Sequence, residues 1–332
     1  MRIALCSPIF LAISFGWLYK DGAQPITFLW MKYCFPLALI WTFTYKPSWS
    51  TNWGHHVITT YFVDVISFGS ITLLFAILSF ASLSFFWSRM SWLSRMISLL
   101  AFLIGLYLSI KSGSRTGWLS FPVFLYILFW GYILPTQGRL KSFLIILFVL
   151  VLILIFIQFS PFFAQKVLNA VTDVTNYNWN SQSVEGSADL IISFFRMAIF
   201  YFLQNPIKGW GDLGWQALVD SPEIIQFASK HARHFAQHGF HNEVLTNAVR
   251  SGIWGLVTSI SFFVFPTIVA IKSFHKPACR FSAFFIIFFM LHIFLTGMTT
   301  EITNLVFLAS FYSLTIAVMV GELLSTLSRK TL

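Results

Sequence analysis

The stretch ISFGSITLLFAILSFASLSFFW, residues 66–87, contains no charged side chain over its whole length. A helix needs about 20 predominantly apolar residues to cross the hydrocarbon core of a bilayer. This stretch meets that requirement, and comparable apolar runs recur along the chain. It therefore predicts a transmembrane helix within an all-α, polytopic integral membrane protein.

The composition supports the same class. The 332 residues are 57% hydrophobic and only 10% charged, and the mean hydropathy is +0.78, which leaves too few polar groups to cover a soluble domain. We expect about nine transmembrane helices, judged by the length of each apolar run. These runs occupy residues 3–19, 27–44, 66–87, 96–111, 117–134, 142–163, 253–271, 282–298 and 303–323. One long connection, residues 165–252, is the only candidate extramembrane module, and short helices are expected in it.

Basic residues indicate which side of the membrane each connection faces. Lysine and arginine collect in connections that are separated by an even number of predicted spans, at residues 89–95, 139–141, 272–280 and 329–330. The positive-inside rule places such connections in the cytoplasm, so the 165–252 connection falls on the opposite side. The formal net charge of +10 is explained in this way and implies no nucleic-acid partner.

The segment HARHFAQHGFHNEVLTNAVRSG, residues 231–252, gathers titratable groups within an apolar sequence. A continuous helix would place four histidines on one face, namely His231, His234, His238 and His241. Imidazoles at such spacing could bind zinc or copper or line a solvated face, but no nearby cysteine or HExxH order supports a metal site. We expect a helix over 231–250, closed by Gly252, in which Gly239 could introduce a break. We also expect one working histidine, His241, whose neutral imidazole can accept a proton from a hydroxyl.

Two arginines lie where a charge is costly. Arg115 belongs to the hairpin SGSRTGW, residues 112–118, at the predicted membrane edge, and Arg196 lies within an apolar helix expected to end before Pro206. A guanidinium group keeps its charge and presents a fork of donors that fits phosphate. Either residue could instead be an interfacial anchor whose charged end reaches water.

Three more polar residues lie in or beside the predicted spans. Asp64 enters the span 66–87 and could be an acceptor-binding group or a structural one. Glu301 lies on the same side of the membrane and could pair with an arginine. His292 lies inside the span 282–298, where a hydrogen-bonded core histidine is expected.

The order of these motifs resembles the O-antigen ligase family, which also includes related O-antigen polymerases. SGSRTGW is followed by Arg196, by NPIKGWG at residues 205–211, and by HGFHNEVLTNAVRSGIWGL at residues 238–256. The resemblance makes residues 61–325 a ligase-like membrane domain. It leaves residues 1–60 as membrane helices without a recognisable motif, and the family commonly has more spans than are expected here.

The resemblance implies a bacterial inner-membrane glycosyltransferase whose 165–252 loop is periplasmic. Such an enzyme transfers a glycan from undecaprenyl diphosphate to a sugar hydroxyl of lipid A-core, with no metal ion or cofactor. Its partners would be the lipid-linked donor, the acceptor glycan and membrane lipid. By the same resemblance, His241 would activate the acceptor hydroxyl, Arg115 and Arg196 would hold the diphosphate, Arg250 would add a contact, and Asn242 would orient the histidine.

Three alternatives stay open. A polymerase would use the same donor chemistry to join repeat units on the lipid carrier. A polyprenyl-glycan transporter would also place arginines near a lipid diphosphate, but it should show polar residues deep within several spans. A metal-binding protein would depend on His231, His234 and His238 as much as on His241.

Overall fold

The protein is described here from a computed structural model. The described residues are 29–44, 48–52, 55–59, 63–114, 116–128, 168, 171–172, 174–177, 179, 187–303 and 306–328. Arg115 and the expected spans 3–19 and 142–163 lie outside these residues. The chain divides into two compact units. Unit 1 contains Met1–Leu125, Phe263–Thr296 and Ile302–Leu332, and unit 2 contains Tyr126–Phe262 and Gly297–Glu301.

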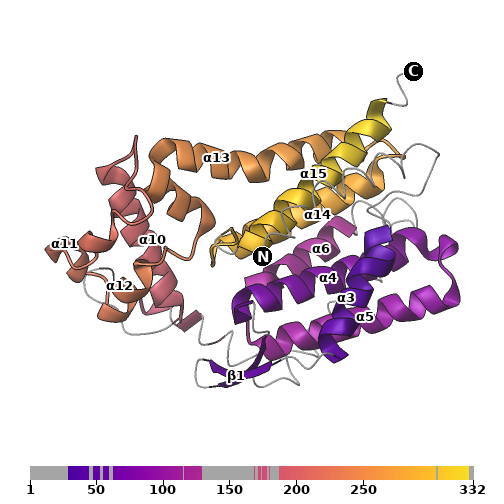
Figure 1. The fold of residues 1–332 in the computed structure, drawn as a ribbon, viewed down its shortest axis with the longest axis horizontal. Helices are drawn as coiled ribbons and strands as arrows, with labels where there is room; N and C mark the ends of the chain where they lie inside the picture. Colours follow the sequence, from indigo (N-terminus) through magenta and orange to yellow (C-terminus); the bar gives the residue numbers. More distant parts are fainter. Residues whose placement is uncertain are drawn as a thin grey trace. The chain divides into compact units, whose positions relative to one another are not determined.

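The described chain is mostly helical (Figure 1). Five of its helices are long and apolar enough to cross a membrane: Val65–Leu83, Trp92–Ser112, Glu243–Phe274, Arg280–Gly297 and Leu308–Leu327. A shorter apolar helix covers Thr116–Ile127. The membrane character and five of the expected spans are thereby supported, and the full count of nine stays a prediction.

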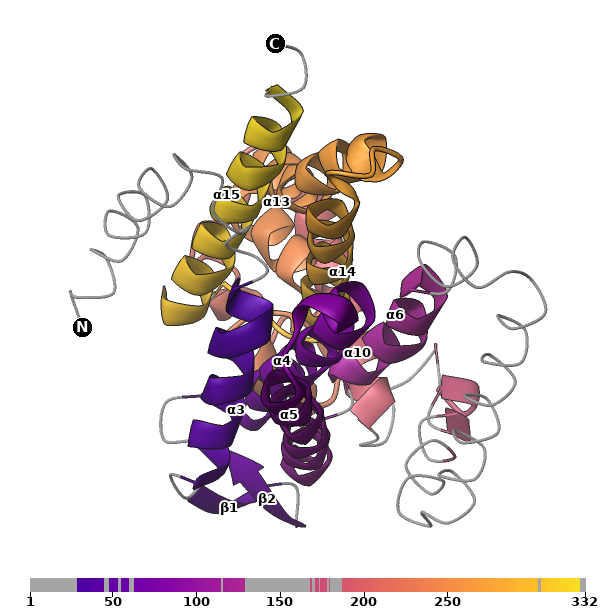
Figure 2. The same cartoon turned by 90° about the vertical axis from the view of Figure 1, so that its right-hand side faces the viewer.

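Unit 1 is built around α4 (Val65–Phe86), which packs against α5 (Trp92–Ser112) and α3 (Phe35–Thr44) (Figures 1 and 2). The remaining elements are η2 (Trp30–Cys34), η3 (Trp87–Arg89), η4 (Thr116–Leu119), α6 (Ser120–Leu128), α14 (Arg280–Gly297) and α15 (Val306–Ser328). The apolar segments of unit 1 therefore form helices that pack against one another. Side chains from several of these helices meet in the core between them. Phe124 of α6, for example, packs edge to face on Phe288 of α14, with 5.3 Å between the ring centroids.

Two short strands depart from the all-α expectation. β1 (Ser48–Asn52) and β2 (His55–Thr59) pair antiparallel, with Ser48 opposite Thr59. The β-branched residues Val57 and Ile58 fit a pleated, half-buried surface, and both are buried.

Local capping explains where the central helices begin. The Asp64 carboxylate accepts hydrogen bonds from the backbone N–H groups of Ile66 and Ser67, both at 2.9 Å, and so caps α4. Ser91 caps α5 in the same way through the N–H of Ser94. Of the two roles considered for Asp64, acceptor binding and structural support, the structural role as a helix cap accounts for these hydrogen bonds.

A buried polar network confirms the expectation for His292. Its Nε2 atom lies 2.9 Å from Ser70 Oγ of α4, and its Nδ1 atom lies 2.8 Å from Ser120 Oγ of α6. Thr296 Oγ1 lies 2.6 Å from Ser70 Oγ. Since both ring nitrogens have hydroxyl partners, this histidine joins three helices as a satisfied core group.

Unit 2 contains α10 (Ser187–Gln204), η6 (Gln216–Leu218), α11 (Pro222–Ile225), α12 (Lys230–Ala236) and the first part of α13 (Glu243–Phe274). The apolar helix expected before Pro206 is confirmed as α10. These short helices surround one buried cluster: Phe194, Met197, Ala198, Tyr201, Trp215, Val219, Ile224, Ala228, Ala232, Ala236, Phe240 and Val249. We call this set the aromatic cluster.

The expected continuous helix over 231–250 is wrong. α12 ends at Ala236, where the indole N–H of Trp215 donates to the Ala236 carbonyl at 2.8 Å. Gly239 then adopts φ 142°, a conformation that a residue with a side chain rarely adopts, and α13 begins at Glu243. His241 therefore lies in the turn after α12, as does His238, whereas His231 and His234 lie on the helix. The expected stop at Gly252 is confirmed, because its φ of 63° and ψ of −145° are not helical and divide α13 into two helical parts at a kink.

Two glycines let separate parts of unit 2 approach backbone to backbone. A Cβ atom on Gly252 would lie 2.5 Å from the Ile207 carbonyl oxygen, and one on Gly209 would collide with the Arg250 carbonyl. Hydrogen bonds fix the contact: Trp210 N donates to Val249 O at 2.8 Å, and Ile253 N donates to Pro206 O at 2.7 Å. The NPIKGWG segment is thereby docked on the bend in α13.

Gly209→Ala tests this close approach, with Gly211→Ala as the matched control. Both glycines have φ 70°, but a Cβ on Gly211 meets nothing within 4 Å. The strain of a left-handed residue is common to both changes, so Gly209→Ala should cost about 1–3 kcal/mol more through overpacking. The measurement is the denaturant-induced unfolding of the full chain in detergent. Equal destabilisation by the two changes would contradict the tight contact.

Candidate functional site

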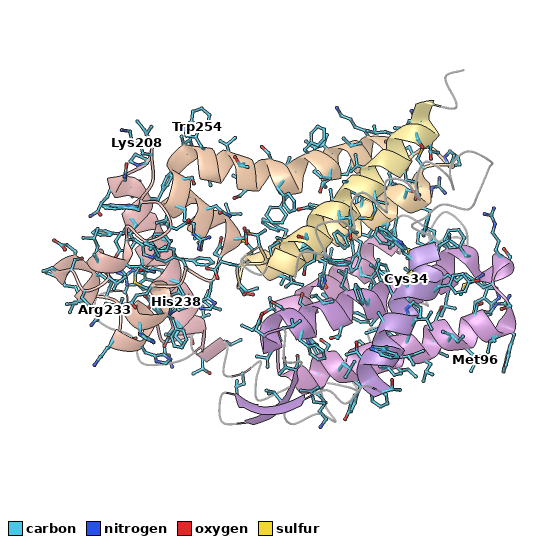
Figure 3. The ribbon with its side chains drawn as sticks, in the orientation of Figure 1. Cys34, Met96, Lys208, Arg233, His238 and Trp254 are labelled. Atoms are coloured by element: carbon cyan, nitrogen blue, oxygen red, sulfur yellow. The ribbon has the colours of Figure 1, made fainter. Side chains whose placement is uncertain are left out.

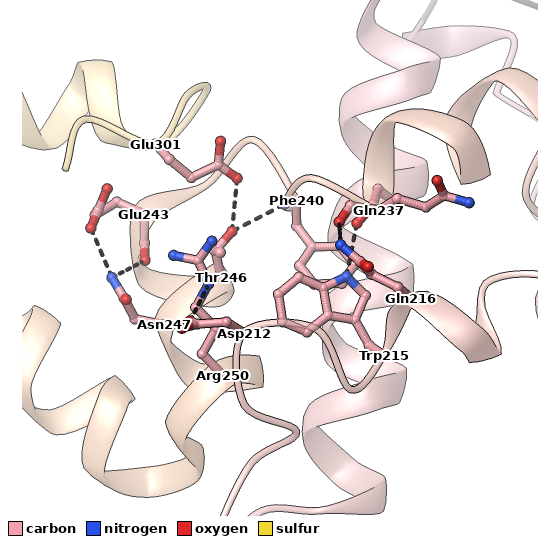
Figure 4. Close-up of polar contacts among 11 residues, drawn as sticks. Asp212, Trp215, Gln216, Gln237, Phe240, Glu243, Thr246, Asn247, Arg250 and Glu301 are labelled. Carbon is pink, nitrogen blue, oxygen red and sulfur yellow. Dashed lines mark hydrogen bonds and ion pairs between the residues drawn. The ribbon is translucent and has the colours of Figure 1, made fainter. Parts of the chain in front are cut away.

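The turn between α12 and α13 is held by the Glu301 carboxylate (Figure 4). Glu301 Oε1 accepts a hydrogen bond from the backbone N–H of His241 at 2.7 Å and another from the Thr246 hydroxyl at 2.9 Å. The same hydroxyl oxygen accepts from the N–H of Phe240 at 3.0 Å. A Cβ on Gly239 would collide with Glu301 Oε1, so only glycine allows the carboxylate to come this close.

His241 is strained by this arrangement. Its φ of 49° is the only positive value at a non-glycine position in the described chain. Left-handed backbone costs a residue with a Cβ atom about 1–2 kcal/mol, and such strain persists only where the surroundings enforce it. Here Glu301 supplies that enforcement, and the direction of the imidazole follows from the main chain.

The His241 ring is placed by aromatic packing. It stacks on Phe194 of α10, with 4.9 Å between centroids and 29° between planes, and it lies near Phe235. The side chain is half-buried. No residue in the described parts of the chain forms a hydrogen bond with either ring nitrogen. The imidazole is therefore fixed in position while its nitrogens stay available for proton transfer.

Asn242 supports the turn through the backbone. Its Oδ1 accepts from Leu245 N at 2.9 Å and caps α13, and its Nδ2 donates to the Met298 carbonyl at 3.4 Å. No described contact joins this amide to the imidazole of His241. Asn242 can thus orient His241 only indirectly, by fixing the adjoining peptide.

Arg196 lies among aromatic rings. Its Nη1 donates to the Tyr177 hydroxyl at 3.1 Å, and its Cζ lies 4.2 Å from the Phe227 ring centroid and 5.6 Å from that of Trp179. No carboxylate within the described residues pairs with it. A half-buried guanidinium that is held by ring faces keeps most of its N–H donors available to bind an anion.

Arg250 combines a weak ion pair with a ring contact. Its Nε lies 3.6 Å from Asp212 Oδ1, and its Cζ lies 5.8 Å from the Trp215 ring centroid. The Asp212 side chain is 87% exposed, so this pair is largely screened by water. A phosphate group could therefore compete with Asp212 for the guanidinium.

The aromatic cluster supports the side chains of His241, Arg196 and Arg250. His241 lies on Phe194 and Arg250 on Trp215, both members of the cluster, and Arg196 lies on Phe227, which packs against it. No described contact joins the three side chains directly. The cluster also buries Tyr201, which raises the pKa of its hydroxyl above the usual range, and the charge of Asp220 raises that pKa further.

The other histidines of the segment lie outside this arrangement. His231, His234 and His238 are exposed, and their ring contacts are with Phe235 and with one another. The described residues contain no group of three or more His, Cys, Asp or Glu side chains that could hold a metal ion. Within that part of the chain, the metal-binding alternative has no geometric support.

Glu301 is the residue whose role sequence reasoning missed. The sequence suggested only that it could pair with an arginine. No described arginine pairs with it, and its carboxylate accepts from a backbone N–H and a hydroxyl instead. Its position in GMTTEIT, between two apolar runs, was the available signal. Of the sequence-predicted site residues, Arg196, His241, Asn242 and Arg250 all lie in unit 2, while Arg115 lies outside the described residues.

No family model matches the sequence, and no curated protein matches it. The resemblance to O-antigen ligases therefore rests on the motifs and their order.

Removing the Glu301 carboxylate should loosen the His241 turn. Glu301→Ala leaves two donors without their acceptor, at about 1–3 kcal/mol for an unsatisfied buried group. Glu301→Gln keeps a carbonyl oxygen as acceptor, so the turn should retain most of its protection against hydrogen exchange. Hydrogen exchange at residues 237–246, followed by mass spectrometry on the full chain, measures the difference. Glu223→Ala removes an exposed acid of α11 and is the control, and unchanged exchange in Glu301→Ala would exclude this role.

Proposed function

We propose that the protein is a metal-independent membrane glycosyltransferase of the O-antigen ligase type. It moves a glycan from undecaprenyl diphosphate to a sugar hydroxyl of lipid A-core, at the periplasmic face of a bacterial inner membrane. The observation that carries the proposal is the His241 turn. A strained backbone held by Glu301 presents an imidazole whose nitrogens have no hydrogen-bond partner among the described residues.

The proposed reaction is a displacement at the anomeric carbon of the donor sugar. The acceptor hydroxyl oxygen attacks that carbon while His241 takes the hydroxyl proton. The bond between the anomeric carbon and the diphosphate oxygen breaks, and undecaprenyl diphosphate leaves with the bonding electrons. A general base of this kind typically contributes about 10²–10⁴-fold.

The arginines suit the other half of the reaction. A diphosphate is a good leaving group once its charge is neutralised, and fixed guanidinium groups can do this without a metal ion. Arg196 is the strongest candidate, since its described contacts are with rings and one hydroxyl. Arg250 would add a second contact by exchanging Asp212 for phosphate, and Arg115 is expected to contribute from its hairpin.

A polymerase that joins repeat units on the lipid carrier would use the same residues, because only the acceptor differs. The transporter alternative has one observation in its favour, the polar groups inside the spans. His292 and Glu322 are both fully buried. However, His292 is hydrogen-bonded through both ring nitrogens, and Glu322 Oε1 accepts from Ser282 at 2.5 Å, so these groups connect helices. Transfer chemistry accounts better for the strained histidine.

The first test is glycan display in cells that lack their own ligase. The wild-type chain should restore long-chain lipopolysaccharide on a gel, and His241→Ala should lose it, because transfer falls by about 10²–10⁴-fold without the base. His238→Ala is the matched control, since this exposed histidine of the same segment should leave transfer intact.

Three results would change the assignment. Normal display by His241→Ala would remove the general-base role. Equal loss in both histidine variants would favour the metal-binding alternative. If the inserted wild-type chain restores nothing, the same variants go into a strain lacking its polymerase, where restoration would favour polymerase activity.

Arg196→Met should weaken transfer at the donor side. Loss of one stabilising cation or donor at a developing negative charge costs about 10²–10³-fold in kcat. The measurement is transfer by purified protein from a lipid-linked glycan. Arg233→Met is the control, because Arg233 is already bound to Asp220 at 2.9 Å and to the Ala228 carbonyl. Equal activity of the two variants would remove Arg196 from the site.

A further inference from the structure

We infer that unit 2 rests in the headgroup region of a lipid bilayer through an apolar patch formed by Leu203, Ile207, Ile253 and Trp254. The inference concerns how this unit meets the membrane. It stands independently of the proposed transfer activity.

The four side chains are large, apolar and exposed. Leu203 and Ile207 are each 68% exposed and Trp254 is 70% exposed, and Ile253 is 39% exposed. The aromatic cluster shows that this unit can bury large apolar side chains, whereas these four lie on its surface. A concentrated set of such residues marks a contact surface.

The two segments that supply the patch are held together by backbone contacts. Ile253 N donates to the Pro206 carbonyl at 2.7 Å, and Gly252 fits closely beneath the Ile207 carbonyl. Leu203 lies in the last turn of α10, directly before this junction. The residues of the patch therefore come from backbone segments that adjoin one another: the end of α10, the following turn and the bend in α13.

The patch continues along a helix that is suited to the bilayer. Trp254, Val257 and Ile260 recur at helical spacing on α13, and the latter two are 49% and 45% exposed. α13 belongs to the helices that are long and apolar enough to cross a membrane. Its exposed apolar side chains therefore meet lipid, and Trp254 marks the boundary with water, where tryptophan is enriched.

The charge beside the patch fits a phospholipid surface. Lys208 is exposed next to Ile207, and Figure 3 shows Lys208 and Trp254 toward the same edge of the unit, away from Arg233 and His238. A lysine can lay its aliphatic stem along apolar surface and reach phosphate with its ammonium group. Anionic headgroups favour basic residues at this level.

A second copy of the chain is the other possible occupant. Lipid is favoured because the patch is continuous with the apolar side of α13, and because Lys208 would bring like charges together at a symmetric contact. The two occupants predict different behaviour of a probe placed on the patch.

Nitroxide labels at Leu203→Cys and Ile207→Cys test the inference, with His238→Cys as the exposed control on the same unit. Cys6, Cys34 and Cys279 are first changed to serine in the full chain, which is then placed in vesicles of phosphatidylethanolamine and phosphatidylglycerol. Electron paramagnetic resonance measures the collision of each label with oxygen, which concentrates in lipid, and with a water-soluble nickel chelate.

The labels at 203 and 207 should shift toward oxygen and away from the chelate relative to the label at 238. Chelate contact equal to that of the 238 label would place the patch in water and overturn the inference. Spin–spin broadening at 203 and 207, removed by dilution with unlabelled chain, would make the patch an interface between copies and would also overturn it. The labelled positions are exposed, so neither substitution disturbs the aromatic cluster.

Discussion

The geometry of the candidate site depends on one carboxylate oxygen. Glu301 Oε1 binds both the backbone of His241 and the hydroxyl of Thr246, at the point where the chain passes from α12 to α13. Water could satisfy the same donors, but it could not hold a left-handed histidine in place. The acceptor must come from a part of the protein outside the turn, and residue 301 is 60 positions away from His241. The local strain is thus maintained by a long-range contact, as expected where a side chain must be held in an unusual direction.

Arg233 and Arg196 of unit 2 are held in different ways. Arg233 pairs with Asp220 at 2.9 Å and also binds a carbonyl, so its charge is used within the protein. Arg196 is held by ring faces and one hydroxyl, which fix the guanidinium without neutralising it. Since ring faces attract a cation but leave its edge donors exposed, they suit a group that must still bind an anion. The contrast separates a structural arginine from a candidate ligand-binding arginine within one small unit.

Local and periodic features were predictable from the sequence, and long-range contacts were not. Hydropathy predicts the apolar helices because span length follows from bilayer thickness, and the end of α10 follows from Pro206. The break after α12 depends on Trp215, whose indole takes the last carbonyl, and on the approach of Glu301 to Gly239. Neither partner is close in sequence, so the sequence predicted a helix over 231–250, with Gly239 as its only local signal of a break. The β1–β2 hairpin was missed for a different reason, because its strands are short and weakly patterned.

In the NPIKGWG and RSGIWGL motifs, the glycines have a different role from the charged residues. Gly209 in NPIKGWG and Gly252 in RSGIWGL meet at one junction, where two backbones come closer than any side chain permits. That junction orders the first turns of α13, and with them Thr246 and Arg250, before any substrate is considered. A motif of this kind therefore combines a structural requirement with a chemical one. A chain could satisfy the first with glycine alone, whereas the proposed transfer would also need the histidine and the arginines. The strained His241 therefore supports the proposal more than the glycines do.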